Sequence, residues 1–360
     1  MSMTPLERVE AVLWGHGPDH VPFTVYESKL PPCAVERQLR NEGLCIHNRH
    51  YTPMKPVTPN CSVETHTYTP PPQTGDVYAG ETLVKTTTRT PAGDLIAVNK
   101  PAGFTSWRVE LPFKTADDYP ALIALAEDTQ FLPDHETYEK ALAWMGDDVI
   151  LRATLGYSPL QAIIYNLMGV ETFCIEWAER RDRVMELYEA LAARDRRAFE
   201  VLATGPCPYV QYCGNVSPQI VGRERFRELI LPLYDEFGAM LHEHGKLFGC
   251  HLDADCGLLA DLIGESELDF IEAFTPAPDT DMSIADARRA WPCKILWANF
   301  PSSVHLADQE QIYATACQMI DEDGGSQKLI IGITEDVPED RWQENFLTIN
   351  RACREYGRYG

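Results

Sequence analysis

The sequence contains no long apolar run and is poor in positive charge. No stretch approaches the roughly 18 consecutive apolar residues that a membrane-spanning helix needs. Lys and Arg number 31 against 54 Asp and Glu, which gives the 360-residue chain a net charge of −23. Nucleic acids and anionic membranes require a positive face, so we expect neither as a partner. The first residues also lack the basic and apolar regions of a secretory signal, which predicts a cytoplasmic protein.

Glycine-rich phosphate signatures of the P-loop and dinucleotide types are absent as well. The eleven cysteines are an odd number, so they cannot all form internal disulfides, and in a reducing compartment they stay free thiols. With 44% hydrophobic residues, the chain has enough apolar surface for a folded core. The composition therefore fits an acidic globular enzyme, or one that docks on a basic patch of a partner.

Residues 1–115 are expected to form an N-terminal elaboration that contains the first strands. Thr4 begins a capping-box pattern, which predicts a helix at its start. Residues 20–26 predict a buried strand. Prolines interrupt residues 28–80, which we interpret as a long loop suited to a lid or a substrate wall. A β-hairpin is expected at residues 83–98, because a turn rich in Pro, Gly and Asp separates two strand-like runs.

From residue 116 to residue 360, short apolar strands alternate with amphipathic helices. The expected strands are 149–154, 209–212, 246–250, 270–274, 295–298 and 329–332. The expected helices are 136–146, 159–168, 180–203, 223–244, 256–264, 283–290, 307–322 and 338–355. This alternation predicts a parallel sheet covered by helices. With the first strand and one from the hairpin region, eight strands are available. We predict an α/β protein with one domain, a single (β/α)8 TIM barrel elaborated by an N-terminal helix, long loop and β-hairpin.

Polar residues just beyond each strand are the candidates for a site, because such barrels build their sites at the carboxyl ends of the strands. The densest group runs from residue 250 to residue 256, where one strand end brings together a histidine, two carboxylates and two thiols. These residue types suit zinc. The candidate metal ligands are His251, Asp253, Cys256 and Cys213. Alternatively, the histidine bonds a backbone carbonyl, an aspartate caps the next helix and the thiol is simply buried.

Other strand ends supply candidates for substrate binding and acid–base chemistry. Glu335 follows the last strand and is either a ligand or an acid–base group. Asp336, Glu339 and Asp340 are expected to cap the final helix, since negative charge favours a helix N-terminus. The candidate substrate-binding residues are Glu27, Tyr157, Asn215, Glu272 and His47.

Several segments, in their order along the chain, resemble the uroporphyrinogen decarboxylase superfamily. They are residues 4–9, 17–22, 169–173, 224–234, the strand end at His251, and 270–276. This similarity covers almost the whole chain and implies a (β/α)8 barrel. True decarboxylases of the superfamily carry an arginine-rich motif just after the first strand. Here that place reads Val25-Tyr26-Glu27-Ser28-Lys29-Leu30-Pro31, and a glutamate there disfavours a polyanionic porphyrinogen.

The chain looks more like the other branch, the corrinoid-dependent methyltransferases. That resemblance implies zinc held by a His-x-Cys pair at this strand end and by a further Cys at the last strand. His251 matches the histidine, Asp253 stands where the first Cys would be, and Ile333 stands about where the last Cys would be. The zinc is then either lost or held by a harder ligand set, which would suit an O- or N-demethylating relative.

The sequence therefore predicts a methyltransferase. It would move a methyl group between a small O-methyl or N-methyl compound and a corrinoid carried by a partner protein. Whether zinc assists the reaction, and which oligomeric state the protein has, are left open. The predicted catalytic residues are His251, Asp253 and Glu335, and the acidic surface would dock the corrinoid protein. The alternatives are a decarboxylase or lyase of a small or tetrapyrrole acid, and a non-catalytic barrel that binds a small molecule.

Overall fold

The structure is a computed structural model that describes residues 3–72, 77–103 and 105–359. Four residues of the long loop expected from the sequence, 73–76, lie outside this description. The chain divides into two compact units. Unit 1 comprises Met1–Met54, Pro133–Gly156 and Leu202–Gly360, and unit 2 comprises Lys55–Leu132 and Tyr157–Val201. Within the described ranges, no helix combines the length and apolar character needed to cross a bilayer.

Unit 1 is built around a parallel sheet of nine strands. They are β1 (Phe23–Tyr26), β2 (Cys45–Asn48), β9 (Val149–Leu151), β10 (Ala153–Leu155), β11 (Tyr209–Tyr212), β12 (Leu247–His251), β13 (Phe270–Phe274), β14 (Ile295–Asn299) and β15 (Leu329–Ile333). Their hydrogen-bonded order is β10-β11-β12-β13-β14-β15-β1-β2-β9. The two ends of this order, β9 and β10, are separated in the chain by Arg152 alone, so the sheet runs round into a barrel with eight strand positions. The predicted (β/α)8 barrel is confirmed.

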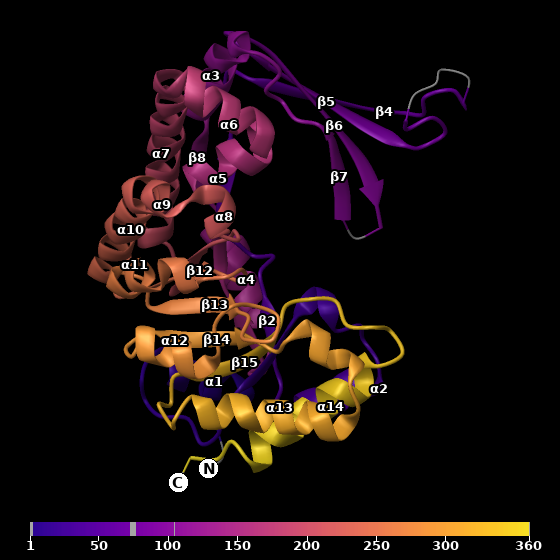
Figure 1. The fold of residues 1–360 in the computed structure, drawn as a ribbon, viewed down its shortest axis with the longest axis vertical. Helices are drawn as coiled ribbons and strands as arrows, with labels where there is room; N and C mark the ends of the chain where they lie inside the picture. The colour runs from indigo at the N-terminus through magenta and orange to yellow at the C-terminus, as the bar shows by residue number, and fades with distance from the viewer. Residues whose placement is uncertain (1–2, 73–76, 104, 360) are drawn as a thin grey trace. The chain divides into compact units, whose positions relative to one another are not determined.

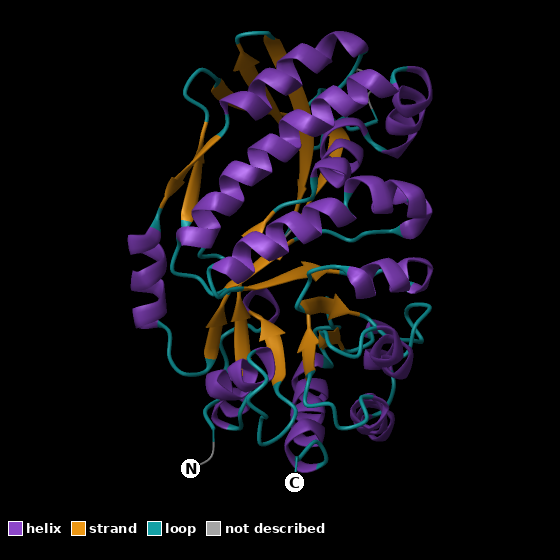
Figure 2. Ribbon diagram, turned by 90° about the vertical axis from the view of Figure 1, so that its left-hand side faces the viewer, coloured by secondary structure: helices purple, strands orange, loops and turns teal. Residues whose placement is uncertain are grey.

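Helices lie between successive barrel strands and cover the sheet (Figures 1 and 2). They are α2 (Ala34–Asn41), α4 (His135–Trp144), α8 (Pro218–Val221), α9 (Arg223–Leu229), α10 (Leu231–Glu243), α11 (Ala260–Glu265), α12 (Ile284–Ala290), α13 (Gln309–Glu322) and α14 (Trp342–Glu355). The single helix expected over 223–244 is two helices, because Pro232 cannot donate a backbone hydrogen bond and sits in the first turn of α10.

One barrel strand comes from a different segment than the sequence predicts. The second strand is β2, which pairs with β1 and β9, and no strand of the hairpin region described here joins the barrel. β2 is only four residues long and lies between proline-rich segments, so its strand pattern was hidden in the expected loop. The hairpin strands instead satisfy their backbone groups by pairing with one another in a separate antiparallel sheet.

Unit 2 contains that four-stranded sheet, a long twisted ribbon (Figure 1), together with several helices. Its strands are β4 (Ser62–Tyr68), β5 (Leu83–Thr90), β6 (Gly93–Ala102) and β7 (Thr105–Glu110), and β3 (Met54–Val57) pairs with β8 (Gln130–Pro133). Its helices are α3 (Tyr119–Asp128), α5 (Pro159–Gln161), α6 (Val170–Glu179) and α7 (Arg181–Thr204). The hairpin predicted at 83–98 is confirmed as β5 and β6, and a π-helical segment, Ala162–Met168, continues α5.

Helix α1 (Pro5–Leu13) packs against the amino-terminal ends of the barrel strands. The predicted capping box is present, since the Thr4 hydroxyl accepts from the Glu7 amide and the Glu7 carboxylate accepts from the Thr4 amide. The buried side chains of Val9, Val12 and Leu13 pack with the first residues of several strands. Those strand residues are Cys45, Ile150, Tyr209, Phe270 and Ile295. One end of the barrel is therefore sealed by apolar contacts, and the other is left for polar groups.

A buried histidine of unit 1 makes the stability of the fold depend on pH. His305 is 1% exposed, and burial lowers the pKa of its imidazole to about 4. Because its unfolded-state pKa is about 6.5, the unfolded chain takes up the proton first. Lowering the pH from about 6.5 to about 4 should therefore reduce the free energy of unfolding, by up to about 3 kcal/mol from this group alone.

Urea unfolding of wild type and His305→Phe across this pH range measures that effect. The variant should show the smaller loss of stability toward pH 4. His16→Phe is the matched control, because His16 is exposed to water in the folded chain. Parallel pH profiles of wild type and His305→Phe would contradict the prediction.

Candidate active site

A layer of polar side chains lies two residues beyond the apolar layer on four of the barrel strands. Alternate residues of a strand face the same side, so these side chains share the barrel interior with the core residues that precede them. The four are His47 on β2, Arg152 after β9, Gln211 on β11 and Glu272 on β13, each at most 1% exposed. His251, the last residue of β12, stands next to them.

The Glu272 carboxylate is the centre of this layer. One of its oxygens, Oε1, accepts a short hydrogen bond from the Tyr26 hydroxyl. The other, Oε2, accepts from Gln211 Nε2 at 2.8 Å and lies 2.7 Å from His251 Nδ1. Arg152 Nη1 lies 3.6 Å from the same oxygen. A fully buried carboxylate is thus held by two cations and two neutral donors.

These contacts keep Glu272 ionised despite its burial. Burial alone would raise the pKa of its carboxyl group, but the positive charges of Arg152 and His251 hold that pKa well below its usual range. The arginine is equally dependent on the glutamate, because its guanidinium is 1% exposed. Charged pairs buried in this way stabilise a protein only as long as both partners are present.

His251 links the buried layer to the outer rim. Its Nδ1 faces Glu272, and its Nε2 lies 3.1 Å from the Asp253 carboxylate. Burial would lower the pKa of the imidazole, but the two carboxylates raise it to about 10. His251 is therefore protonated at neutral pH and is 19% exposed at its side chain. The structure brings together His251, Asp253 and Glu272, three of the residues predicted from the strand ends.

His47 is neutral and keeps one ring nitrogen free. Burial and the neighbouring charge of Arg152 lower the pKa of its imidazole well below the usual value. Its ring stacks on Trp297 with centroids 4.2 Å apart and meets Tyr26 edge-on. Its Nδ1 lies 3.9 Å from the Glu272 carboxylate. Its Nε2 is buried and has no hydrogen-bond partner among the described residues.

Two further members of the layer also carry buried polar atoms without a hydrogen-bond partner in the described part of the chain. They are Nε and Nη1 of Arg152 and Oε1 of Gln211. Buried polar atoms of a folded protein are nearly always paired, and exceptions are concentrated where a ligand or water completes the set. The layer thus offers two kinds of donor and one acceptor to a bound molecule.

The backbone next to Glu272 is strained. Ala273 has a φ of +57°, and the pairing of β13 with β14 shifts register between residues 272 and 274. A non-glycine residue in the left-handed region costs of the order of 1–2 kcal/mol, and such residues gather at functional sites. The shift lets Glu272 point into the barrel while the strand continues.

The rim beyond His251 is formed by acidic and amide side chains. The Asn215 side chain accepts from the Asp253 amide at 3.4 Å. Glu335, exposed after β15, carries a carboxyl group whose pKa is raised by partial burial and by the negative charge of Asp253. Asp253, Glu335 and Asn215 therefore lie at one end of the barrel, as predicted, and add negative charge outside the protonated histidine.

Glu27 belongs to a second polar group beside β1. Its Oε1 lies 3.3 Å from Arg49 and 3.1 Å from His50, while its Oε2 is buried without a partner in the described structure. The Arg49 guanidinium also covers the Tyr26 ring at 3.5 Å, which ties Glu27 to the central layer. The Glu27 side chain is 12% exposed and faces these cations from one side.

The acidic run after the last strand does not cap the final helix. Asp336 instead pairs with Lys29 at 2.5 Å. Helix α14 begins at Trp342, and its N-cap residue, Arg341, makes no side-chain cap. The expected role was wrong because the helix starts several residues later than the sequence pattern predicts.

The predicted zinc ligands do not form a metal site as the structure places them. Both ring nitrogens of His251 lie within hydrogen-bond distance of carboxylates, so in this arrangement neither is left free as a metal ligand. The Cys256 thiol is 2% exposed, contacts the carbonyl of residue 254 at 3.1 Å, and has a pKa raised by burial. Among the described residues, no three His, Cys, Asp or Glu side chains are grouped to hold a metal ion, and Cys213 is no exception.

Sequence reasoning missed Arg152, Gln211 and Tyr26. Tyr26 and Gln211 belong to strands, and Arg152 lies between β9 and β10, inside the single strand expected at 149–154, so a search for residues beyond strand ends passes over all three. The available signal was a charged or amide residue inside an otherwise apolar strand, as in Val-Ile-Leu-Arg and Tyr-Val-Gln-Tyr. Tyr157, predicted at a strand end, belongs to unit 2, where its ring packs against Tyr165.

The fold and this buried polar layer define a (β/α)8 barrel with an ionised site at its carboxyl end. A solved structure described as a methyltransferase from Methanosarcina mazei aligns over 99% of this chain and 99% of its own, with a TM-score of 0.58 and 12% sequence identity. A nitroalkane oxidase from Streptomyces ansochromogenes aligns over 55% of this chain and 53% of its own, with a TM-score of 0.26 and 13% identity. No family model and no curated protein matches the sequence. The first likeness shows the fold over the full length.

Removal of the Glu272 carboxylate should lower the stability of the folded chain. In Glu272→Gln, Arg152 and His251 lose their shared counter-charge while remaining buried, so the free energy of unfolding should fall by about 3–5 kcal/mol. Asp253→Asn is the matched variant, because it removes the outer carboxylate of the same histidine and leaves the buried arginine paired. Urea unfolding at pH 7 measures both.

The same two variants should lower the pKa of His251 from about 10, and Glu272→Gln should lower it further because its carboxylate is the stronger of the two. Histidine titration by NMR gives the values. A pKa unchanged in both variants, or equal losses of stability, would contradict the central role of Glu272.

Proposed function

We propose that the protein is a methyltransferase that moves a methyl group from a small O-methyl or N-methyl compound to a corrinoid carried by a partner protein. Two observations support the class of reaction. The chain shares its whole fold with a protein described as a methyltransferase, and its sequence resembles the corrinoid-dependent branch named above. The chemistry itself is argued from the side chains of the site.

The observation that carries the proposal is the position of His251, with one ring nitrogen at the Glu272 carboxylate and the other at the Asp253 carboxylate. The bond between a methyl group and an ether oxygen or amine nitrogen is hard to break, because the heteroatom must take the bonding electron pair and is then a poor leaving group. A proton donated to that atom as the bond breaks makes it a better leaving group. The imidazolium Nε2–H lies on the partly exposed side of the ring, and Asp253 holds it there until a substrate heteroatom replaces the carboxylate.

The proton and electron balance of the step is simple. The methyl group leaves as a cation equivalent, the heteroatom keeps the electron pair, and the proton of His251 converts it to an alcohol, phenol or amine. The corrinoid of the partner would supply the nucleophile that accepts the methyl group. Glu272 then holds the neutral imidazole by Nδ1–H until solvent returns the proton. Glu335 and Asp253 are positioned at the rim to assist that return.

Arg152, His47 and Gln211 are proposed to orient the substrate. Their unpaired buried atoms present donors and one acceptor to a small molecule, which fits a compound that bears oxygen atoms besides its methyl group. Glu27 and Asn215 would contact the same molecule from the rim. Tyr157 stays a prediction for this role.

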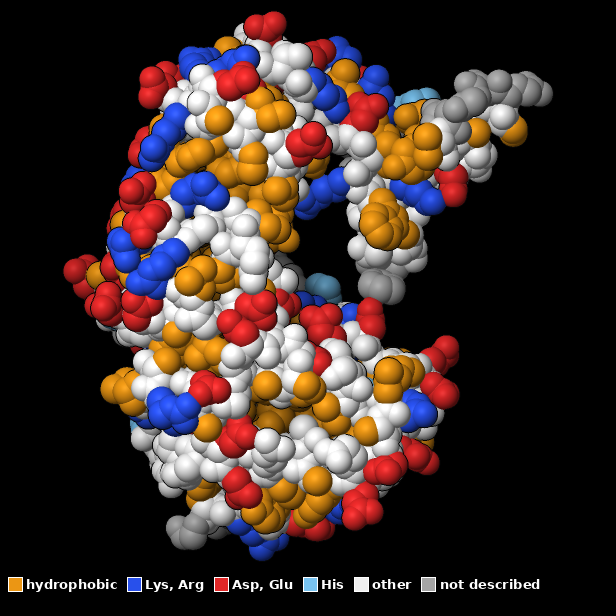
Figure 3. All heavy atoms as spheres, in the orientation of Figure 1, with side chains coloured by type: hydrophobic (Ala, Val, Ile, Leu, Met, Phe, Trp, Pro, Cys, Tyr) orange, Lys and Arg blue, Asp and Glu red, His pale blue; other side chains and the backbone are white. Residues whose placement is uncertain are grey.

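Partner docking and zinc are separate parts of the proposal. The face drawn in Figure 3 carries both acidic and basic side chains, and the proposed docking of a corrinoid protein rests on the net charge of −23. Zinc stays a prediction from the sequence. No step above uses it, because the donor set as placed does not fit the metal.

A test is demethylation with reduced cobalamin as the methyl acceptor and a panel of aryl methyl ethers and methylamines. We expect formation of methylcobalamin with at least one donor. His251→Gln should lower the rate by about 100-fold or more, in line with the loss of a general acid. His244→Gln is the matched control, since His244 lies at the end of α10 and bonds only the carbonyl of residue 240.

Absence of product across the panel would overturn the proposal, as would equal rates for wild type and His251→Gln. The buried, partly unpaired Arg152 favours one alternative, the decarboxylation of a small acid. Release of CO2 from a carboxylate substrate without cobalamin would show that second function.

A further inference from the structure

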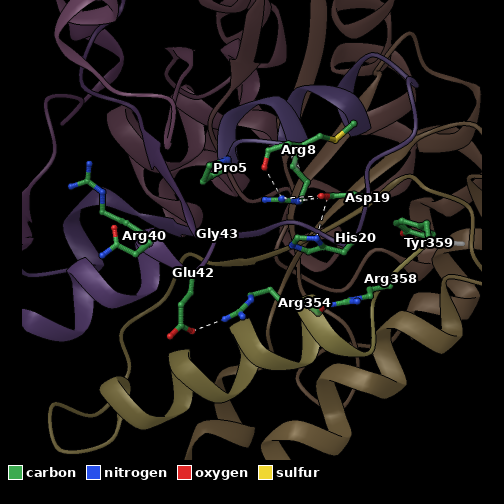
Figure 4. A pocket seen from close by; sticks show the side chains of 12 residues that line it. Pro5, Arg8, Asp19, His20, Arg40, Glu42, Gly43, Arg354, Arg358 and Tyr359 are labelled. Carbon is green, nitrogen blue, oxygen red and sulfur yellow. Dashed lines mark hydrogen bonds and ion pairs between the residues drawn. The ribbon is translucent and has the colours of Figure 1, made fainter. Parts of the chain in front are cut away.

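A cavity of about 540 Å³ lies at the amino-terminal side of the barrel, away from the site described above. It is bordered by α1, by the loop before β1, by the end of α2 and by the end of α14 (Figure 4). Four arginines and one histidine line it, against two carboxylates. They are Arg8, Arg40, Arg354, Arg358 and His20, with Asp19 and Glu42. In a chain with a net charge of −23, such a gathering of positive charge is unexpected.

Three of the four arginines are already paired with carboxylates. Arg8 Nε binds Asp19 at 2.6 Å, and Arg354 binds Glu42 at 2.6 Å. Arg40 binds two carboxylates outside the cavity, one of them with two parallel hydrogen bonds. Arg358 differs, because the only contact described for its guanidinium is with the backbone carbonyl of Arg354 at 3.0 Å. One positive charge at the cavity therefore has no carboxylate partner in the described structure.

A buried donor at the cavity has no hydrogen-bond partner among the described residues either. It is Nη1 of Arg8, whose side chain is 5% exposed. Gly43 leaves open the space in front of this nitrogen. A Cβ at Gly43 would lie 3.5 Å from Arg8 Nη1 and 4.0 Å from His20 Nε2. The backbone thus lacks a side chain at the point where the unpaired donor faces the cavity.

The lowered pKa of His20 indicates a positive electrostatic potential at the cavity. Burial and then the charge of Arg8 lower the pKa of its imidazole to about 4, and Arg354 and Arg358 act in the same direction. The field is positive although Asp19, 3.1 Å from the ring, opposes it. A negatively charged ligand would reverse this effect.

We propose that this cavity is a binding site for a phosphate group. A phosphate offers acceptor oxygens to Arg8 Nη1 and to the Arg358 guanidinium, and planar guanidinium groups match the geometry of its oxygens. The volume exceeds what one phosphate needs and lies in the range of small-molecule sites. The ligand is therefore either free phosphate or the phosphate group of a small metabolite. The site is distinct from the methyl chemistry and does not depend on it.

Calorimetric titration of the full chain with sodium phosphate, at constant ionic strength and pH 7.5, tests the proposal. Glycerol phosphate is titrated in parallel. We expect saturable binding of at least one of them. Tighter binding of glycerol phosphate identifies a phosphorylated metabolite as the source, and tighter binding of inorganic phosphate identifies the free ion.

Arg358→Gln should weaken this binding at least tenfold, because a hydrogen bond to a charged group contributes about 1.5–3 kcal/mol. It breaks no described ion pair, so the variant should fold. Arg351→Gln, which changes an exposed residue of α14 whose guanidinium packs on Tyr313, is the matched control and should bind as wild type does. A second readout is the pKa of His20 by NMR, which should rise from about 4 on addition of phosphate.

No binding of either compound would overturn the proposal. Equal binding by wild type and Arg358→Gln would do the same, since it would indicate an unspecific effect of anions. If Arg358→Gln does not fold, the wild type alone tests the proposal. A pKa of His20 that stays unchanged at a saturating phosphate concentration would then overturn it.

Discussion

The structure of the site follows from one constraint, the burial of the Glu272 carboxylate inside the barrel. A carboxylate removed from water costs several kcal/mol unless charges and donors replace its hydration. Tyr26, Gln211, His251 and Arg152 supply that replacement from four different strand positions. The charge state of His251 is a consequence of this arrangement, and so is the ability of the site to give up a proton. Each of these side chains would be unfavourable in the barrel without the others.

The fold could be predicted because its signal is spread over the whole chain. Alternating apolar strands and amphipathic helices specify a closed parallel sheet whatever the details of any one element. Strand β2 is the exception. β2 was overlooked because four residues among prolines give too short a pattern to distinguish a buried strand from a loop, and only the pairing with β1 and β9 identifies it. Such a strand is specified by its neighbours in space and not by its own sequence.

The site could be predicted only in part, for a related reason. His251 and Asp253 were found because they lie at or just beyond a strand end, where polar residues stand out against the preceding apolar run, and Glu272 was found near the end of the strand 270–274. Arg152 and Gln211 lie in the same buried layer as Glu272 and were passed over because their sequence context is that of a core residue. His47 was thought to lie in a loop, although the stacking of its ring on Trp297 places it in the same deep layer. Zinc was suggested by residue types and by the resemblance to the corrinoid-dependent methyltransferases, and neither specifies whether a histidine nitrogen faces a metal or a carboxylate.

The way in which the chain leaves unit 1 and returns to it has a consequence for insertion and deletion during evolution. Unit 2 consists of two excursions, 55–132 and 157–201, each of which leaves unit 1 and returns to it. The ends of the first excursion are held together by a hydrogen bond from the amide of Asp134 to the carbonyl of Pro53, 2.9 Å long. The strand order of the barrel therefore does not depend on how many residues lie between Pro53 and Asp134. The entropic cost of closing such a loop grows only slowly with its length. Relatives of this protein can lengthen, shorten or replace that excursion by insertion and deletion while keeping the same barrel.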